Sequence, residues 1–232
     1  MQLELAVTTY EEAQIAAKYA FNRVEVCSAL EVGGLTPSAG LIRQCAKYAE
    51  VEVHVLIRPR AGHFYYSSDE VAIMMRDIRE AAKQGARGVV IGALNTDLSL
   101  DLESIERMFV QATNLGLEVT MHRAFDFAKS PETALKQLIK IGIHRLLTSG
   151  QKDKAIDGID TIRAIVSQAN NRIQIMAGSG VGAENCKQLK DSGIQALHFS
   201  ARKPSEGTDL NMGTLYQPDE IKIQNILKEL KS

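Results

Sequence analysis

The chain of 232 residues contains no tryptophan, only three cysteines and no long apolar run. Because a membrane-spanning helix needs about 20 consecutive apolar residues, we expect no membrane span. Cys27, Cys45 and Cys186 are odd in number and far apart, which excludes a disulfide framework and a CxxC zinc or redox motif. We therefore expect reduced thiols, which are typical of a cytoplasmic protein.

The sequence also has no excess of charge of either sign. Lys plus Arg number 27 and Asp plus Glu number 28, so no net field attracts nucleic acid or an anionic membrane. The first five residues show neither the basic nor the apolar segment of an export signal, and we expect a cytoplasmic protein. No low-complexity tract or linker divides the chain, which is long enough to bury one large core.

Short β-branched runs alternate with longer helical patterns along the chain. Units of this kind, each of roughly 25 to 30 residues, favour a closed parallel barrel over a doubly wound open sheet, which usually has about five or six strands. We therefore predict an α/β fold with a single (β/α)8 TIM-barrel domain over residues 1–232. The predicted strands are Gln2–Val7, Arg23–Cys27, Val51–Arg58, Gly88–Gly92, Leu117–Arg123, Arg145–Ser149, Arg172–Gly178 and Ala196–Ala201.

The C-terminal part departs from this alternation. Residues 202–218 are predicted as a long polar loop that contains Gly and Pro, and residues 219–231 are predicted as the last helix. A loop of this length at the mouth of a barrel is either a lid or a disordered segment. The sequence leaves both alternatives open.

Alternation within the strands points charged side chains into the barrel. Val24 and Val26 share the face that meets the helices, so Glu25 between them turns inward. His54 and His198 follow the same rule on other strands. A buried carboxylate must be paired, so the set is either a structural network, in which histidines and an arginine satisfy the acids, or a functional site. Several members lie at carboxyl ends of strands, which favours function, whereas a structural or solvent-facing role is expected for Glu4, Glu52 and Glu118.

Two strand ends carry residues suited to catalysis. Arg58 and Arg60 offer forked donors for a carboxylate or a phosphate, unless one of them pairs with an acid inside the barrel. His122, Arg123 and Asp126 follow another strand, and a histidine beside an arginine and an acid suits proton transfer on an anionic substrate. The alternative is that Asp126 caps a helix and Arg123 forms a surface ion pair.

Small residues follow the last three strands. They allow backbone N–H groups to approach an anion, and the loops after the seventh and eighth strands are the usual phosphate site of a TIM barrel. Such turns also arise from tight packing alone. The predicted anion-binding residues are Arg60, Ser149, Gly178, Ser179, Gly180 and Ser200.

Cys27 shares the inward face of its strand with Glu25, which suggests a thiol at the barrel mouth. Cu(I) prefers thiolates, and His122 or His198, with His198 favoured, is the candidate second ligand, although a single cysteine makes a poor site. Cys45 and Cys186 lie in apolar helical patterns and are predicted to be core residues.

Together these motifs resemble the CutC family, whose members are called copper homeostasis proteins. The resemblance spans roughly residues 1–203 and implies a TIM barrel, a cytoplasmic location, homo-oligomers that are often dimers, and copper binding. The matching stretches are Arg23-Val-Glu-Val-Cys-Ser-Ala-Leu, Gly33-Gly-Leu-Thr-Pro-Ser, Val53-His-Val-Leu-Ile-Arg-Pro-Arg, His122-Arg-Ala-Phe-Asp, Leu147-Thr-Ser-Gly-Gln, Met176-Ala-Gly and His198-Phe-Ser-Ala.

The chain also departs from the family pattern. Ala6 stands where the family commonly has a cysteine, which removes a partner for Cys27, and His63 stands where an acid is usual. Two functions of different classes follow. One is a protein that binds Cu(I). The other is an enzyme of unknown reaction on a small anionic or phosphorylated compound, in which Glu25 or His122 is the general base and arginines orient the anion. A barrel kept only for protein contacts is a third, weaker interpretation.

Overall fold

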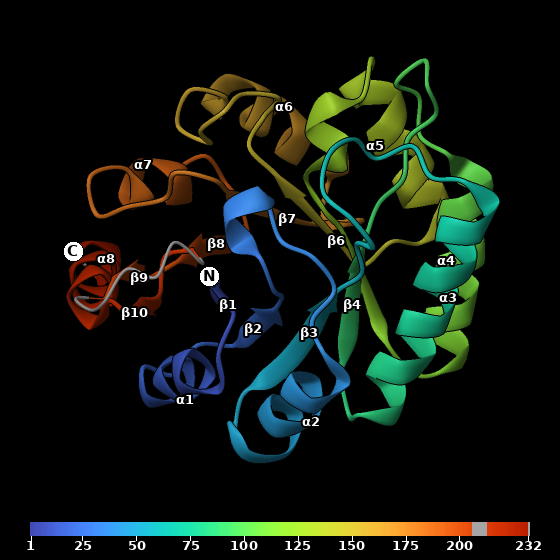
Figure 1. Cartoon of the computed structure of the whole chain (residues 1–232). Coiled ribbons are helices and arrows are strands. Elements are labelled where there is room, and N and C mark those ends of the chain that lie inside the picture. Colours follow the sequence, from blue (N-terminus) through green and yellow to red (C-terminus); the bar gives the residue numbers. More distant parts are fainter. Residues whose placement is uncertain (206–212, 232) are drawn as a thin grey trace.

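The computed structural model describes residues 1–205 and 213–231. The barrel strands are β1 Gln2–Val7, β2 Arg23–Val26, β3 Glu52–Leu56, β4 Gly88–Ile91, β5 Glu118–Met121, β6 Arg145–Thr148, β7 Gln174–Gly178 and β8 Ala196–Ser200. They run parallel and close into one barrel, because β1 pairs with β2 on one side and with β8 on the other (Figure 1). This closure confirms the predicted TIM barrel and excludes the doubly wound open sheet.

Helices follow the strands and surround the barrel (Figure 1). They are α1 Tyr10–Lys18, α2 Ala39–Tyr48, α3 Ser68–Lys83, α4 Leu102–Asn114, α5 Pro131–Ile141, α6 Ile159–Ala169, α7 Cys186–Lys190 and α8 Glu220–Lys231, with 3-10 turns η1 Leu30–Val32 and η2 Arg123–Phe127. Local sequence starts several of them: Thr9 with Glu12, and Ser67 with Glu70, form capping boxes at α1 and α3. Across the described residues, no helix is both long and apolar enough to cross a bilayer.

The main core lies between the outer face of the barrel and the helices. Strand residues of the outer face, such as Val24, Val55 and Leu197, are fully buried there, as the alternation predicts. Inside the barrel are two small apolar clusters, Cys27 with Leu56 and Val90, and Leu147 with Met176 and Ala196. Polar side chains fill the remaining interior and position the site.

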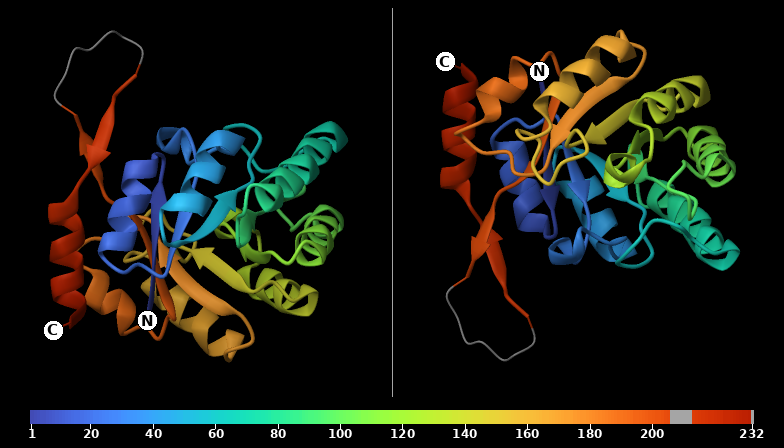
Figure 2. Two further views of the ribbon diagram at one scale, coloured as in Figure 1. Left: turned by 90° about the horizontal axis from the view of Figure 1, so that it is seen from below. Right: turned by 90° about the horizontal axis from the view of Figure 1, so that it is seen from above.

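The range predicted as a loop, 202–218, contains two short strands. β9 (Arg202–Pro204) and β10 (Tyr216–Pro218) pair antiparallel. The guanidinium carbon of Arg202 lies 4.1 Å from the Tyr216 ring centre and adds a cation–π contact to this pair. The two strands extend away from the barrel (Figure 2), and they line no part of the pocket described below. Residues 206–212 of the predicted loop lie outside the described residues.

Candidate functional site

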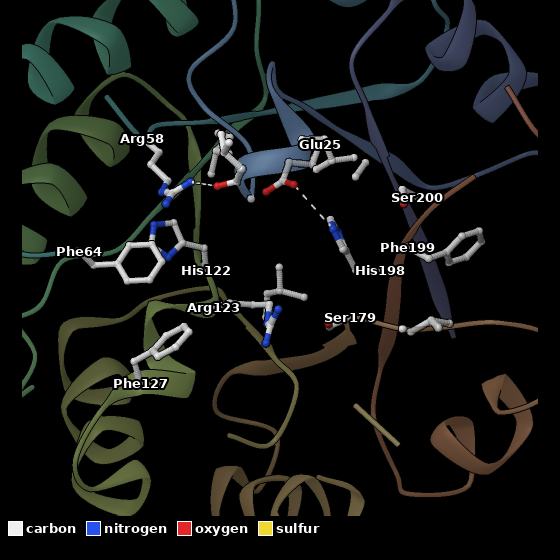
Figure 3. A pocket seen from close by; sticks show the side chains of 18 of the residues that line it. Glu25, Arg58, Phe64, His122, Arg123, Phe127, Ser179, His198, Phe199 and Ser200 are labelled. Carbon is white, nitrogen blue, oxygen red and sulfur yellow. Dashed lines mark hydrogen bonds and ion pairs between the residues drawn. The ribbon is translucent and has the colours of Figure 1, made fainter. Parts of the chain in front are cut away.

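A cavity of about 510 Å³ opens at the carboxyl ends of the barrel strands (Figure 3). Pockets of roughly 300–1,000 Å³ are the usual size for small-molecule ligands. The wall combines charged side chains with Phe64, Phe127 and Phe199. The predicted site residues that line it are Glu25, Arg58, His122, Arg123, Ser179, Gly180, His198 and Ser200.

Three neighbouring strands bring a chain of charged groups into the barrel. β1 places Glu4 opposite Arg23 of β2 and opposite His198 of β8. Arg23 Nε donates to Glu4 Oε2 at 2.5 Å, and His198 Nδ1 donates to Glu4 Oε1 at 2.7 Å. His198 Nε2 lies 3.7 Å from Glu25 Oε2, so the imidazole bridges two buried carboxylates (Figure 3). Within the described chain, His198 is the side chain that contacts both Glu4 and Glu25, and Arg58 contacts neither of them.

The two carboxyl groups beside His198 have opposite pKa shifts. Burial raises the pKa of Glu4, but the hydrogen bond and charge of His198, with the charge of Arg23, outweigh it and leave this pKa well below its usual value. Burial dominates at Glu25; the charge of His198 opposes it, the charge of Glu4 adds to it, and the pKa rises to about 7. Glu25 therefore exchanges a proton near neutral pH, as acid–base catalysis requires.

His198 itself is held by these acids. Burial disfavours its charged form, but the hydrogen bond to Glu4 and the charges of Glu25 and Glu4 outweigh burial and raise its pKa. Because one ring nitrogen is already bound to Glu4, His198 has a single nitrogen left to face the Glu25 carboxyl group. This imidazole consequently positions Glu25 and is a poor candidate for a metal ligand.

His122 follows β5 and lies across the pocket from His198 (Figure 3). Its Nδ1 accepts a hydrogen bond from the Ala124 amide at 3.0 Å, so the neutral ring carries its proton on Nε2. Burial and the charge of Arg58 lower the pKa of His122 to about 3. The buried Nε2 has no partner among the described residues. His122 is therefore a neutral hydrogen-bond donor, and this geometry favours Glu25 over His122 as the base.

The ring of His122 fits only because glycine, Gly92, directly follows the neighbouring strand β4. A Cβ atom built on Gly92 would lie 2.4 Å from the imidazole Cε1 and 2.6 Å from Nδ1. Any side chain at this position would displace the ring, since carbon atoms do not approach so closely. The small residue before the β4–α4 loop thus sets the position of the donor.

Arg58 lies on the pocket wall, but most of its donors hold the loop between β2 and α2. Nη1 donates to the carbonyls of Val32 and Gly34 at 2.8 Å each, and Nη2 donates to the carbonyl of Gly62 at 2.9 Å. The buried Nε has no partner among the described residues. Arg58 thus gives the pocket positive charge, whereas the sequence predicted an open fork.

The structure places Arg60 outside the pocket. Its guanidinium donates to Glu70 and to the backbone carbonyls of Ala61, His63 and Tyr65. These bonds fix the loop between β3 and α3. They also occupy the guanidinium N–H groups that Arg60 would need in order to bind an anion in the predicted site. The position of Arg60 therefore does not support its predicted role.

Asp126 is buried and anchors Arg123 without lining the pocket. Its carboxylate accepts hydrogen bonds from Thr148 Oγ1 at 2.5 Å, from the amide and hydroxyl of Ser149, from the Gln151 amide, and from Arg123 Nε at 2.9 Å. Ser149 also lies behind the pocket wall, where its hydroxyl accepts a bond from Arg123. Both residues position the guanidinium that does face the cavity, and the predicted direct roles have no support in this geometry.

The loop after β7 contributes backbone donors to the wall. Ser179 and Gly180 have φ angles of +82° and +65°, and the Ser179 hydroxyl donates to a backbone carbonyl of the loop after β6. The amides of Gly180 and Val181 donate to no other described residue. Gly178 lies outside the lining, and a Cβ there would lie 2.6 Å from Leu147 Cδ1 and 3.2 Å from His198 Cδ2. Gly178 therefore makes room for Leu147 and, less tightly, for His198, while its neighbours meet the cavity.

Sequence reasoning missed Lys222 and the aromatic side chains. Lys222 lies in the first turn of α8, is half-buried, and donates through Nζ to the Ser200 carbonyl at 2.7 Å. Phe64 contacts Phe127, with ring centres 5.7 Å apart, on the wall nearest His122 (Figure 3). No sequence pattern identified these residues, because their place at the pocket depends on how α8, the loop between β3 and α3, and the η2 turn pack against the closed barrel.

Cys27 does not offer a copper site at the mouth. It is fully buried with Leu56 and Val90, and its Sγ lies 3.6 Å from the Val7 carbonyl. Burial, with the charge of Glu25 as a smaller cause, raises the pKa of the Cys27 thiol well above its usual value. Cu(I) prefers thiolates, and the neighbouring strand supplies no second sulfur because position 6 is alanine.

The predicted ligand pair of Cys27 and His198 is therefore a poor fit for Cu(I). In the part of the chain that the structure describes, the side chains that gather as three potential metal ligands are Glu52, His54 and Glu118. They lie at the amino ends of their strands, away from the cavity. Arg145 Nη2 contacts Glu118 Oε2 at 3.1 Å, and His54 Nε2 contacts Glu52 Oε1 at 2.8 Å, so both acids already have a partner in the chain.

Fold and pocket together define a TIM-barrel protein with a polar cavity at the carboxyl ends of its strands. The CutC family model matches residues 1–203. The chain belongs to the CutC family.

Individual relatives agree with this assignment. The family protein CutC of Glaesserella parasuis is 44% identical over 240 residues, which cover 98% of each chain. That of Pasteurella multocida is 45% identical over 203 residues, covering 87% of this chain and 82% of the relative. A solved structure from Streptococcus agalactiae, named as a copper homeostasis protein CutC, has a TM-score of 0.80 at 34% identity and covers 86% of this chain and 98% of that one. Family and fold predicted from the motifs are thus confirmed.

Proposed function

We propose that this protein is an enzyme that transfers a proton on a small anionic organic substrate, with Glu25 as the general base. One observation carries the proposal: the Glu25 carboxyl group lines the cavity, and its pKa is about 7. A carboxyl group tuned in this way takes up and releases protons at neutral pH, whereas an ordinary glutamate is a weak base.

The neutral ring of His122 supplies the complementary group. When a base removes a proton from a carbon next to a carbonyl, negative charge develops on the carbonyl oxygen. The unpaired Nε2–H of His122 is a donor for that oxygen, and its burial strengthens the interaction. A carboxylate base opposite a neutral imidazole donor suits isomerisation or epimerisation beside a carbonyl group.

The remaining wall supports such a substrate. Arg58 and Arg123 add positive charge that attracts an anion and stabilises the enolate formed by proton removal. Phe64 and Phe127 cover one side with apolar surface, which reduces the water around the reacting groups.

Copper binding, which the family resemblance implies, stays a prediction. Its weakness lies in the donor set, since the described residues of the cavity wall offer carboxylate, imidazole and guanidinium groups and no sulfur. A cytoplasmic location and assembly into homo-oligomers, such as dimers, also stay predictions from the resemblance and the composition.

Deuterium exchange tests the proposed reaction without knowledge of the product. The protein is incubated in D2O with a panel of small hydroxy-ketones, hydroxy-aldehydes and 2-oxo acids, each with and without a phosphate group, and exchange at carbon is followed by NMR. We expect exchange with at least one compound, and a loss of about 100-fold or more in Glu25→Gln.

Two further variants complete this experiment. His122→Ala should slow the exchange, because the developing charge loses its donor. Glu103→Gln, on the exposed face of α4, is the matched control and should exchange at the wild-type rate. Absence of exchange with the whole panel, or full exchange by Glu25→Gln, would contradict the proposed function.

A further inference from the structure

The polar groups of the cavity are divided between two sides. Glu25, Arg58 and His122 lie on one side, and Arg123 and Ser179 lie on the other (Figure 3). The first side contains the proton-transfer groups. The second side contains donors and positive charge but, among the described residues that line the cavity, no carboxylate.

The backbone contributes two donors to the second side. The amides of Gly180 and Val181 make no hydrogen bond to another described residue, and both residues line the cavity. Consecutive positive φ angles at Ser179 and Gly180 turn the chain sharply at this point. Unpaired amides in such a turn are a common binding element for anions.

Two cationic side chains, Arg123 and Lys222, line the same cavity as these amides. Arg123 is held through Nε by Asp126 and through Nη2 by Ser149, so Nη1 remains without a partner among the described residues. Lys222 Nζ donates one proton to the Ser200 carbonyl and has two others available. Burial lowers the pKa of Lys222 by more than the charges of Asp219 and Glu184 raise it, so a further anion beside Lys222 would restore lost solvation of the ammonium group.

The arrangement selects among anions. A planar carboxylate pairs best with the Nε and Nη2 edge of an arginine, but Asp126 and Ser149 already occupy that edge of Arg123. What remains is a set of single donors: one guanidinium nitrogen, one ammonium group and two amides. Such a set suits the three outer oxygens and the double charge of a phosphate group.

We propose that this second side binds the phosphate group of the substrate, which is therefore a phosphate monoester. Its carbonyl end then lies between Glu25 and His122. This inference rests on the proposed function for the location of the reacting end, but the phosphate site itself is testable without any reaction.

The test is calorimetric titration of the protein with inorganic phosphate at pH 7.5 and low salt. We expect one phosphate per chain, and affinity at least about tenfold weaker in Lys222→Gln, because a charged hydrogen bond is lost. Lys228→Gln changes an exposed lysine of the same helix and should bind as the wild type does. Acetate, a planar carboxylate, should bind at least about tenfold more weakly than phosphate.

The results distinguish failure of the phosphate site from failure of the proposed proton-transfer reaction. No phosphate binding by the wild-type protein, equal affinity in Lys222→Gln, or equal losses in the two lysine variants would overturn the phosphate site. Glu25→Gln should bind phosphate at least as well as the wild type, since it removes a nearby negative charge. Phosphate binding with no deuterium exchange would therefore leave this site standing and reject the proposed reaction.

Discussion

His198 Nε2 lies 3.7 Å from Glu25 Oε2, while the opposite nitrogen of the same ring is bound to Glu4 at 2.7 Å. The ring cannot turn toward Glu25 without losing its bond to Glu4. Glu25 therefore receives only part of the stabilisation that a direct ion pair would give, and burial keeps its pKa near 7. This relationship makes Glu25 the group from which most of the expected chemistry follows.

Glu25 should make the protein less stable as pH rises. Its pKa is about 7 in the folded chain against an ordinary value of 4.5, so the folded chain holds a proton that the unfolded chain has released. The resulting stabilisation is complete below about pH 4.5 and is lost as the pH rises through about 7. Glu25→Gln removes this dependence. Relative to wild type, the variant should gain about 1–3 kcal/mol between pH 5 and pH 8.

Urea denaturation of both proteins at the two pH values measures this difference. Glu103→Gln, which changes an exposed acid, should show no such gain. An effect of Glu25→Gln that is the same at pH 5 and pH 8 would mean that the carboxyl group is ionised throughout.

His122 should remain neutral over the physiological range. Its pKa is about 3 in the folded chain against an ordinary 6.5, because of burial and the charge of Arg58. Stability from this group is therefore present above about pH 6.5 and is lost as the pH falls toward 3. Long-range proton–nitrogen NMR should show one tautomer, with the proton on Nε2, unchanged from pH 8 to pH 5. A titration midpoint near pH 6 would refute the role of His122 as a neutral donor.

Asp126→Asn should destabilise the fold. The substitution removes the charge that five donor groups share and directs an amide N–H toward other N–H groups. We expect a loss of about 2–4 kcal/mol in the free energy of unfolding. Asp160→Asn is the control, because that side chain is almost fully exposed and should change stability by less than about 0.5 kcal/mol. Equal effects in the two variants would show that Asp126 is not an anchor.

The copper prediction can be checked directly. The reduced protein is titrated with Cu(I) without oxygen against a competing chelator, alongside Cys27→Ser. Because the Cys27 thiol is buried and has a raised pKa, we expect both proteins to bind equally weakly. Tight binding of one copper per chain that disappears in Cys27→Ser would instead establish a thiolate site.

Several positions of the site follow from local rules of the chain. Side chains alternate along any strand, so the pattern around Glu25 and His198 was sufficient to direct both into the barrel. Their place near the carboxyl ends of the strands follows from the βα order, since the loops after parallel strands all gather at one end. These inferences depend on neighbours in sequence, which is why they agree with the structure.

The partners of the charged groups could not be inferred in the same way. Arg58 and Arg60 look equivalent in sequence, yet one lies on the pocket wall and the other is consumed by Glu70 and loop carbonyls. Asp126 follows a strand end, where a catalytic acid is often found, but the η2 turn directs it into donors of the next loop. Which donor meets which acceptor depends on loop conformations that involve residues distant in the chain.

The sequence by itself determined the barrel, the inward direction of its polar strand residues, and the family, because strand periodicity and ordered motifs are local properties. Only the tertiary structure decided that the pKa of Glu25 lies near 7, that the ring of His122 is neutral, and that Lys222 reaches the cavity. Those properties arise from burial and from charges on other strands and on α8. Proton affinity in a buried site depends on the surrounding field, and that field exists only after distant segments have packed together.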